Sequence, residues 1–519
     1  MDQDVNRSSD NSDMDGEQVE MKELVPAEDE ESSKTDQPQL KRELNLFYLV
    51  GMVVGGIIGS GIFISPKEVL SNVQSYGMAI LVWVIAGVLG MGGGLCYSEL
   101  GTLIKKSGGE FSYLKTAYSF TNKKKYHQVI GELLAFLFVW TTSLLGRPGS
   151  SAVILLTFGE YVTRAANPHC DEISTTTIRL LAISALGIIL LLNCYSAKLS
   201  ALLVTILSFV KLIAAALIII VGVWQFSTGN KPKSAGLFEN TTTDPAKIIF
   251  AFYAALWAYD GWGNLSYTVE EVKNVEKTLP RAILIGIPLI ILVYILINVS
   301  FFAVLSIDEI INSESEAIAI PFGYKTMKET GLVIIPLIVA CSTFGAANGG
   351  IFYVSRLNYA AARDGMYPKF LASIHTQYKT PVPAIVFHTV ITSILIFSGG
   401  IIELLNGVSA AVWVFYTLCF VALIIMRFTV KKKRPFKIWI IVPILMTVSG
   451  VALILVPFSS PADSTYQFAA LGIVLIGVPI YFVTIRGFLK PKILTKLNDQ
   501  FAILSDKLLN SSSSLAPDK

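Results

Sequence analysis

Apolar segments separated by short polar loops fill residues 44–488. Twelve of them are close to the roughly 20 residues that a helix needs to cross the hydrocarbon core of a bilayer. The pattern predicts an all-α membrane protein with 12 transmembrane helices, at 44–70, 77–103, 128–162, 176–195, 201–226, 246–270, 282–305, 331–361, 383–399, 404–428, 438–459 and 466–488.

The first and sixth segments are interrupted in the middle. The first contains Gly55-Gly56-Ile57-Ile58-Gly59-Ser60-Gly61, and each glycine lowers helix propensity by about 1 kcal/mol relative to alanine. The sixth places Asp260, Gly261 and Gly263 inside an apolar run. Two broken helices that are five segments apart are typical of an inverted repeat of five plus five helices. We expect repeat one at 41–227, repeat two at 244–430 and two further helices at 436–489, all within a transmembrane domain at 41–489.

Both ends of the chain are polar. Residues 1–40 carry 13 acidic and three basic side chains without an apolar core, which predicts a disordered acidic tail rather than a signal peptide. Residues 490–519 form a second tail that ends in a serine run, and the weak amphipathic period of 493–509 is consistent with a helix on the membrane surface.

The loops between the segments differ in charge. One set is acidic and includes Asp171, Glu172, Asp308 and Glu309. The other set is basic, which places it and both termini in the cytosol by the positive-inside rule; its charges are Lys105, Lys106, Lys123, Lys124, Lys125, Lys431, Lys432, Lys433 and Arg434. Asn240 then lies outside, in an Asn-Thr-Thr sequence that is a candidate glycosylation acceptor.

The composition narrows the function. The chain is 53% hydrophobic with a net charge of only +3, and its mean hydropathy is +0.60. It lacks a P-loop, zinc-ligand spacing and a nucleophile–base set. We therefore expect neither an enzyme nor a nucleic-acid-binding protein, and no metal or cofactor.

The glycine-rich break is a candidate anion site. Small side chains at Gly59, Ser60 and Gly61 let the backbone approach a ligand, and the N–H groups that begin the following half-helix attract a carboxylate. The alternative is close packing between helices, an explanation that fits Gly87, Gly90 and Gly94 of the second segment better.

Three ionisable side chains lie inside predicted spans, where charge is costly and often functional. Asp260 could bind a substrate ammonium or guanidinium, or pair internally with a basic residue. Lys211 could bind the free carbonyls of the broken first helix, or extend to the membrane interface. The role of Arg147 is open. Trp257, one turn before Asp260, could cover a bound substrate or pack in the core, as could Trp262 and Trp413.

Four motifs resemble one family. They are Gly-Ile-Ile-Gly-Ser-Gly-Ile-Phe-Ile-Ser-Pro-Lys at 56–67, Glu-Leu-Gly-Thr at 99–102 with Lys-Lys-Ser-Gly-Gly at 105–109, Val-Glu-Glu-Val-Lys-Asn at 269–274, and Phe-Gly-Ala-Ala-Asn-Gly-Gly at 344–350. Together they resemble the light chains of heteromeric amino-acid transporters, within the amino acid–polyamine–organocation superfamily.

The resemblance implies a LeuT-like fold of 12 helices and sodium-independent amino-acid exchange at the plasma membrane. It also implies a disulfide to a single-span glycoprotein heavy chain. Cys170, the only cysteine in a polar loop, occupies the corresponding loop between the third and fourth spans. A free thiol is the alternative for this residue.

The resemblance also assigns site residues. Substrate binding is implied for Ile57, Gly59, Ser60, Gly61, Trp257, Ala258 and Asp260, and a substrate pathway for Arg147, Asn348 and Trp413. Lys211 matches a lysine that replaces a sodium ion. Residues 256–262 resemble the exchangers of neutral and basic amino acids and of cystine most closely.

Three residues depart from the family pattern: Gly56 for threonine, Gly263 for asparagine, and Val275 for proline. The last two weaken the assignment of the subtype. The alternatives are an exchanger restricted to large neutral amino acids, and an amino-acid sensor with little turnover.

Overall fold

The computed structural model describes residues 44–59, 61–106, 108–119, 125–168, 173–228, 236–267, 269, 272–313, 318–431, 433–459, 465–486 and 492–513. All of them belong to one compact unit, Lys41–Lys519. Two predicted site residues, Ser60 and Cys170, lie outside the described residues.

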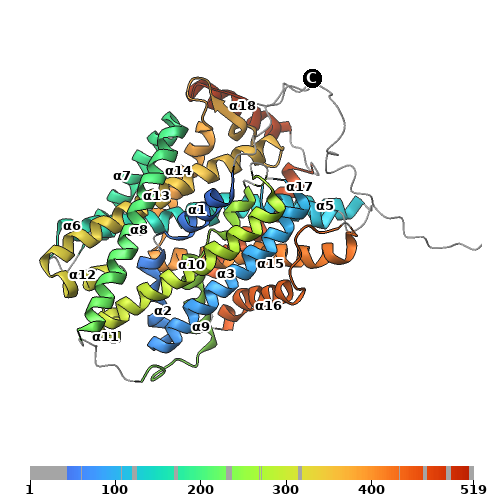
Figure 1. The fold of residues 1–519 in the computed structure, drawn as a ribbon. Helices are drawn as coiled ribbons and strands as arrows, with labels where there is room; N and C mark the ends of the chain where they lie inside the picture. The colour runs from blue at the N-terminus through green and yellow to red at the C-terminus, as the bar shows by residue number, and fades with distance from the viewer. Residues whose placement is uncertain are drawn as a thin grey trace, which may run out of the picture. The chain divides into compact units, whose positions relative to one another are not determined.

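Helices make up nearly all of the described structure (Figure 1). The N-terminal part contains α1 (Leu46–Ile57), α2 (Gly61–Val73), α3 (Tyr76–Ile104), α4 (Glu110–Ser119), α5 (Lys125–Thr141), the π-helix η2 (Thr142–Gly146), α6 (Arg147–Ala166), α7 (Thr175–Tyr195) and α8 (Ala197–Ser227). The middle part contains α9 (Pro245–Ala258), the 3-10 helix η3 (Trp262–Tyr267), α10 (Val275–Val304), α11 (Ile307–Ile311), α12 (Ala319–Met327) and α13 (Glu329–Arg363).

The C-terminal part completes the bundle. It contains η5 (Lys369–Ala372), β1 (Ser373–His375), α14 (Val382–Ser398), α15 (Ile401–Thr429), α16 (Ile441–Leu455), η6 (Val456–Ser459), α17 (Thr465–Thr484), α18 (Lys492–Leu508) and β2 (Ser511–Ser513). Each of the 12 predicted apolar segments overlaps at least one of these helices. Within the described ranges, nine helices are long and apolar enough to cross a membrane, or ten if the bent pair α1–α2 is one span.

Two of the 12 predicted spans are missing from this set because their helices are short. The helices α9 and α14 are apolar but shorter than a full span. Helix α9 begins at Asp244-Pro245, where the aspartate side chain accepts the Ala246 N–H at 2.9 Å, an ordinary start signal for a helix. It ends at the predicted break, and the chain continues as η3. The predicted interruptions of the first and sixth segments are therefore both present.

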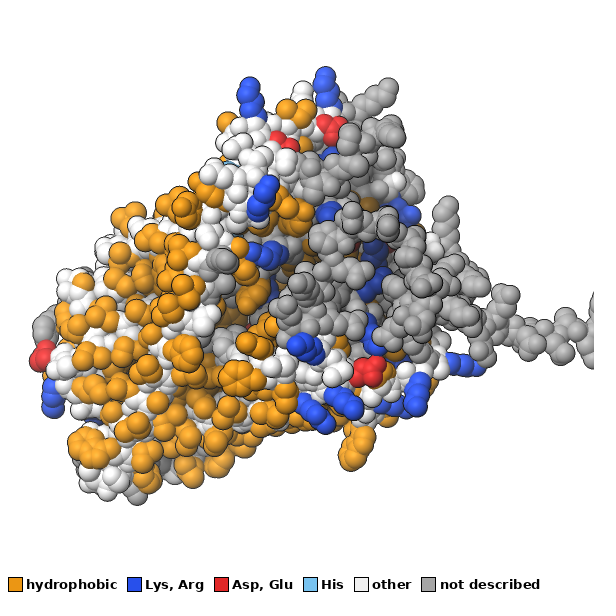
Figure 2. Space-filling view, turned by 45° about the horizontal axis from the view of Figure 1, so that its top comes forward, with side chains coloured by type: hydrophobic (Ala, Val, Ile, Leu, Met, Phe, Trp, Pro, Cys, Tyr) orange, Lys and Arg blue, Asp and Glu red, His pale blue; other side chains and the backbone are white. Residues whose placement is uncertain are grey.

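Large apolar side chains are exposed along several helices. On α7 and α8 they include Leu191, Phe209, Ile213 and Ile220, all more than half exposed. Figure 2 shows hydrophobic side chains covering a broad area of one face. Apolar surface on this scale marks a contact with another apolar phase, which for helices of this length is the lipid bilayer.

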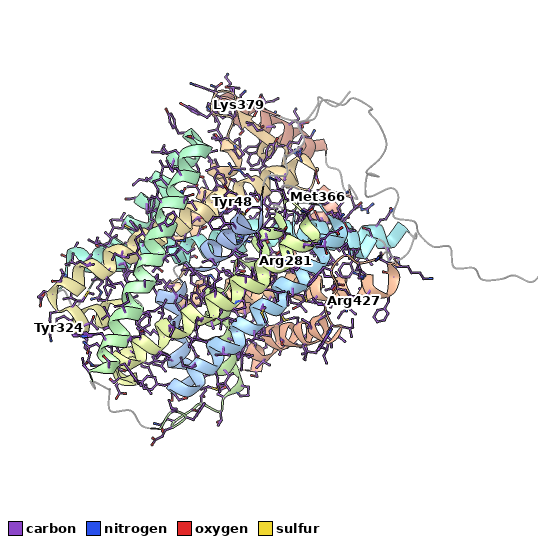
Figure 3. All side chains as sticks on the ribbon, viewed as in Figure 1. Tyr48, Arg281, Tyr324, Met366, Lys379 and Arg427 are labelled. Carbon is purple, nitrogen blue, oxygen red and sulfur yellow. The ribbon has the colours of Figure 1, made fainter. Side chains whose placement is uncertain are left out.

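The loops gather at two ends of the helices. At one end Leu44 pairs with Val272, and Lys105 forms an ion pair with Glu276 at 3.0 Å. At the other end the Lys67 ammonium donates to the carbonyl of Ser313 at 2.7 Å. Tyr324 of α12 lies at the opposite end from Lys379 and Arg427 (Figure 3). The basic loops thus share their end with both termini of the described chain.

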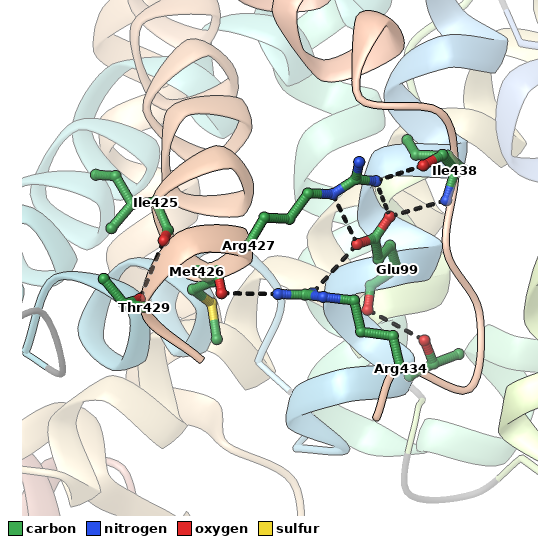
Figure 4. Close-up of polar contacts among 8 residues, drawn as sticks. Glu99, Ile425, Met426, Arg427, Thr429, Arg434 and Ile438 are labelled. Carbon is green, nitrogen blue, oxygen red and sulfur yellow. Dashed lines mark hydrogen bonds and ion pairs between the residues drawn. The ribbon is translucent and has the colours of Figure 1, made fainter. Parts of the chain in front are cut away.

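A buried cluster of ion pairs connects α3 with the end of α15 and the loop between α15 and α16 (Figure 4). The Glu99 carboxylate is fully buried and pairs with Arg427 and Arg434, whose side chains are only 6% and 7% exposed. It also accepts the backbone N–H of Ile438 at 3.0 Å. Arg434, one of the basic charges of the predicted cytosolic loops, is therefore a largely buried partner of Glu99.

The C-terminal tail adds a small two-stranded sheet to the predicted helical fold. Strand β2 pairs antiparallel with β1, with Ile374 opposite Ser512. Neither strand has the alternating apolar pattern that identifies strands in a sequence. The predicted tail helix forms α18, which packs against η5. Its apolar residues Phe501, Leu504 and Leu508 are at least half exposed.

Candidate functional site

The two broken helices touch at their breaks. A methyl group on Gly61, at the start of α2, would lie 2.6 Å from the Cα atom of Ala258, at the end of α9. Gly261 has a φ of +120°, a conformation that favours glycine, and a methyl group there would lie 3.0 Å from the carbonyl oxygen of Gly56. Glycine is thus required at both contacts.

Tyr294 of α10 joins the two breaks. Its hydroxyl lies 2.9 Å from the carbonyl oxygen of Ile57 and 3.0 Å from that of Ala258. Carbonyls that a break releases need a partner inside a membrane, and Tyr294 serves both breaks. Sequence reasoning missed this residue, whose only signal is a tyrosine within an apolar helix.

A cavity lies beside the breaks. Its lining includes four predicted site residues, Arg147, Trp257, Asp260 and Trp413. Tyrosine and acidic side chains complete its polar part: Glu110, Tyr267 and Tyr416. The structure therefore brings together residues from the third, sixth and tenth predicted segments.

The cavity contains opposite charges. Tyr416 donates a hydrogen bond to the Asp260 carboxylate at 2.6 Å. Arg147 donates to the side-chain oxygen of Asn264 at 3.4 Å. The carboxylate of Glu110 accepts from Tyr267 at 2.7 Å and from Tyr97 at 3.3 Å. Three ionisable side chains thus face one space inside a largely apolar bundle.

The position of Arg147 follows from an irregular helix. The π-helix η2 interrupts the third segment immediately before it, and Pro148 occupies the start of α6. Such π-helical turns are rare and occur frequently at functional sites. The irregular turn accounts for a guanidinium on the cavity side of an apolar segment.

The three candidate tryptophans all line the cavity but differ in their packing. The Trp262 ring lies 4.8 Å from that of Tyr97 and 4.7 Å from that of Tyr416, and Gly93 leaves room for it. Trp413 is 5% exposed. Trp257 is half-buried, so it has the largest freedom to contact a ligand.

Other predicted residues lie outside the cavity lining. Ile57, Gly59, Gly61 and Ala258 lie at the breaks themselves. Lys211 is 4% exposed on α8, which disagrees with extension to the membrane interface.

Asn348 belongs to a separate buried network. Its side chain accepts from Asn193 at 2.7 Å and from Ser200 at 3.0 Å. This network connects α13 with α7 and α8. Asn240 lies in an exposed turn, and Gly87 and Gly94 contact α10 side chains, in line with the packing role expected for the second segment.

Broken membrane helices around a charged cavity define a membrane transport protein. Residues 44–482 match the amino acid permease family, and the chain belongs to this family. It is an amino-acid transporter and not an enzyme, as the sequence predicts, and the relationship expected from its motifs is confirmed.

Three relatives show which kinds of amino-acid transporter the chain resembles. The chain is 40% identical over 463 residues to the b(0,+)-type amino acid transporter 1 of Homo sapiens, covering 88% of this chain and 92% of that protein. It is 37% identical over 471 residues to the cystine/glutamate transporter of Homo sapiens, with 91% and 89% covered. It is 37% identical over 477 residues to the large neutral amino acids transporter small subunit 2 of Rattus norvegicus, with 90% and 85% covered.

Proposed function

We propose that this protein exchanges neutral and basic amino acids, and cystine, across the plasma membrane without sodium. The observation that carries the proposal is the position of Asp260 and Trp257 in one cavity beside the two touching breaks. A carboxylate in the side-chain pocket favours a cationic side chain, and a neighbouring aromatic ring adds cation–π attraction of about 0.5–2 kcal/mol. The 40% identity to a b(0,+)-type transporter supports the same range.

Each end of the substrate has its own binding groups. The α-carboxylate binds the backbone N–H groups of Gly59, Ser60 and Gly61. The α-amine binds carbonyls at the breaks, where the oxygens of Ile57 and Ala258 have a second lone pair beside the Tyr294 hydroxyl. The side chain enters the cavity, where Trp257 covers it and Asp260 attracts a positive charge. Arg147 and Trp413, which line the cavity, are assigned to the substrate pathway. Asn348, which the resemblance also assigns to it, would contribute from its separate network with Asn193. Rocking of the bundle around this site opens it to one side at a time.

Lys211 accounts for independence from sodium. Its ammonium replaces a cation that would otherwise neutralise carbonyls of the broken first helix. The burial of this side chain at 4% exposure supports the assignment.

The architecture proposed with this function has 12 spans in a LeuT-like arrangement. Repeat one covers 41–227, repeat two covers 244–430, and two helices follow at 436–489. The basic loops, the acidic tail at 1–40 and the tail at 490–519 are cytosolic, and Asn240 is an external glycosylation acceptor. The gathering of basic loops and termini at one end supports this orientation.

Two other functions have less support. An exchanger restricted to large neutral amino acids has no need of a carboxylate in its side-chain pocket. A sensor would bind amino acids with little turnover, and no feature of the described residues favours it.

The first experiment uses purified protein in liposomes loaded with labelled arginine. External leucine should accelerate arginine efflux several-fold, because an exchanger returns to its inward-facing state faster with an amino acid bound than with an empty site. Replacement of sodium by choline should leave this acceleration intact. Efflux that ignores external leucine contradicts exchange, and tight binding without turnover supports a sensor.

The second experiment tests the covalent partner. We propose that Cys170 forms a disulfide with a single-span heavy chain, in line with the name "small subunit" of one relative. Cys170→Ser should remove a reducible high-mass band from non-reducing gels of cell membranes. Cys341→Ser, which removes an exposed cysteine of α13, is the matched control and should retain the band. Persistence of the band in Cys170→Ser refutes the proposed linkage.

A further inference from the structure

Glu110 is a carboxylate of the cavity that neither the family motifs nor the sequence pattern assigns to substrate. It begins α4, directly after Gly108 and Gly109, which both have positive φ. That turn directs the side chain inward, so that it is only 2% exposed although it stands at the end of a loop. Burial of a carboxylate is costly unless a function or a pair retains it.

The hydrogen bonds of Glu110 come from neutral groups. Tyr267 and Tyr97 donate to it, and neither is a cation. The cationic side chain that acts on it electrostatically is Arg147, which acts on Asp260 as well. Among the described lining residues, two carboxyl groups therefore face one guanidinium.

A chain of contacts connects Glu110 with the broken helices. A methyl group on Gly263 would lie 3.5 Å from the Glu110 carboxylate, and a methyl group on Gly56 would lie 3.7 Å from the Asn264 amide. Glu110 therefore lies beside the segment that follows the second break, and it lines the same cavity as Asp260.

We propose that Glu110 is a second specificity-determining carboxylate, which binds the cationic end of a long basic substrate together with Asp260. The inference rests on the proposed exchange of neutral and basic amino acids. A guanidinium or ammonium that enters the cavity offers these two acidic side chains a second positive charge. Charge-assisted hydrogen bonds to both carboxylates then favour arginine and lysine over shorter cations.

The competing explanation is a structural latch. The Tyr267–Glu110 hydrogen bond also joins the start of α4 to η3, so its loss could disturb transport of every substrate. The two explanations differ in the ratio of arginine to leucine recognition. A latch affects both substrates together, whereas a specificity residue changes their ratio.

The experiment measures the KM of arginine and of leucine for exchange in proteoliposomes. Glu110→Gln should raise the arginine-to-leucine KM ratio by about tenfold, as expected for loss of one charge-assisted hydrogen bond. Asp260→Asn should raise it to a similar extent, and the double variant should raise it further than either. Glu132→Gln is the matched control: this carboxylate pairs with Arg486 at 2.8 Å outside the cavity lining and should leave the ratio unchanged.

Tyr267→Phe tests whether the carboxylate of Glu110 or its hydrogen bond to Tyr267 is important. The variant retains the carboxylate and removes the shorter of its two hydrogen bonds from tyrosines. A loss of exchange in Glu110→Gln that Tyr267→Phe reproduces for both substrates, with the ratio unchanged in both variants, overturns the proposal. So does an unchanged ratio in Glu110→Gln, or an equal loss for both substrates. Failure of the parent protein to exchange any amino acid would instead refute the proposed function, since this inference concerns only selectivity.

Discussion

Gly61→Val is expected to reduce amino-acid exchange by roughly tenfold or more while the protein still inserts in the membrane. Even the first carbon of a side chain at this position would meet the Ala258 Cα atom at 2.6 Å and its Cβ atom at 2.8 Å. The closest atom belongs to the backbone, so no rotation of a side chain relieves the clash. Overpacking of this kind costs about 1–3 kcal/mol, and separation of the breaks displaces the groups that hold the substrate backbone.

The measurement is exchange in proteoliposomes, normalised to the amount of reconstituted protein, with a loss of roughly tenfold or more corresponding to that cost. Gly51→Ala is the control on the same broken helix, because a methyl group there has no neighbour within 4 Å. Full activity in Gly61→Val would mean that the contact between the breaks has no part in transport. Ala258→Gly should rescue the variant only in part, since the Cα atom remains.

Glu99→Ala is expected to produce the largest loss of stability. It leaves the buried guanidinium groups of Arg427 and Arg434 without a counter-charge and the N–H of Ile438 without its acceptor. Removal of one partner from a buried ion pair costs about 3–5 kcal/mol. Thermal unfolding in detergent, followed by the monodisperse fraction after heating, should show a clearly lower midpoint.

The matched control is Glu276→Ala. Its ion pair with Lys105 joins two side chains that are 47% and 40% exposed, and exposed pairs contribute about 0–1 kcal/mol. Its unfolding midpoint should stay close to that of the parent protein. Equal midpoints for the Glu99 and Glu276 variants would show that the buried cluster does not stabilise the bundle.

The helices and their breaks could be predicted because both are local properties. A run of apolar residues specifies a membrane helix, and glycines around Ile57 or an acid and two glycines around Asp260 interrupt it. Asp260 and Arg147 were visible for a similar reason, since charge within an apolar segment stands out in the sequence. The cavity confirms that these two side chains share one space.

Partners that are distant in the chain were not predictable. Tyr416 reaches Asp260 across 156 residues, and Tyr267 reaches Glu110 across 157 residues. Nothing in either local segment distinguishes these tyrosines from others in the apolar helices. Arg434 was grouped with its neighbours Lys431 and Lys433 because all three are basic residues of one loop. Both lysines are exposed, whereas the guanidinium of Arg434 is buried against Glu99.

The two-stranded sheet joins segments that leave the ribosome at different times. Strand β1 is synthesised well before its partner Ser511–Ser513. Until β2 has been made, the edge of β1 has no β2 to pair with. The loop that carries β1 therefore reaches its final structure only after α17, the last long apolar helix, has been synthesised.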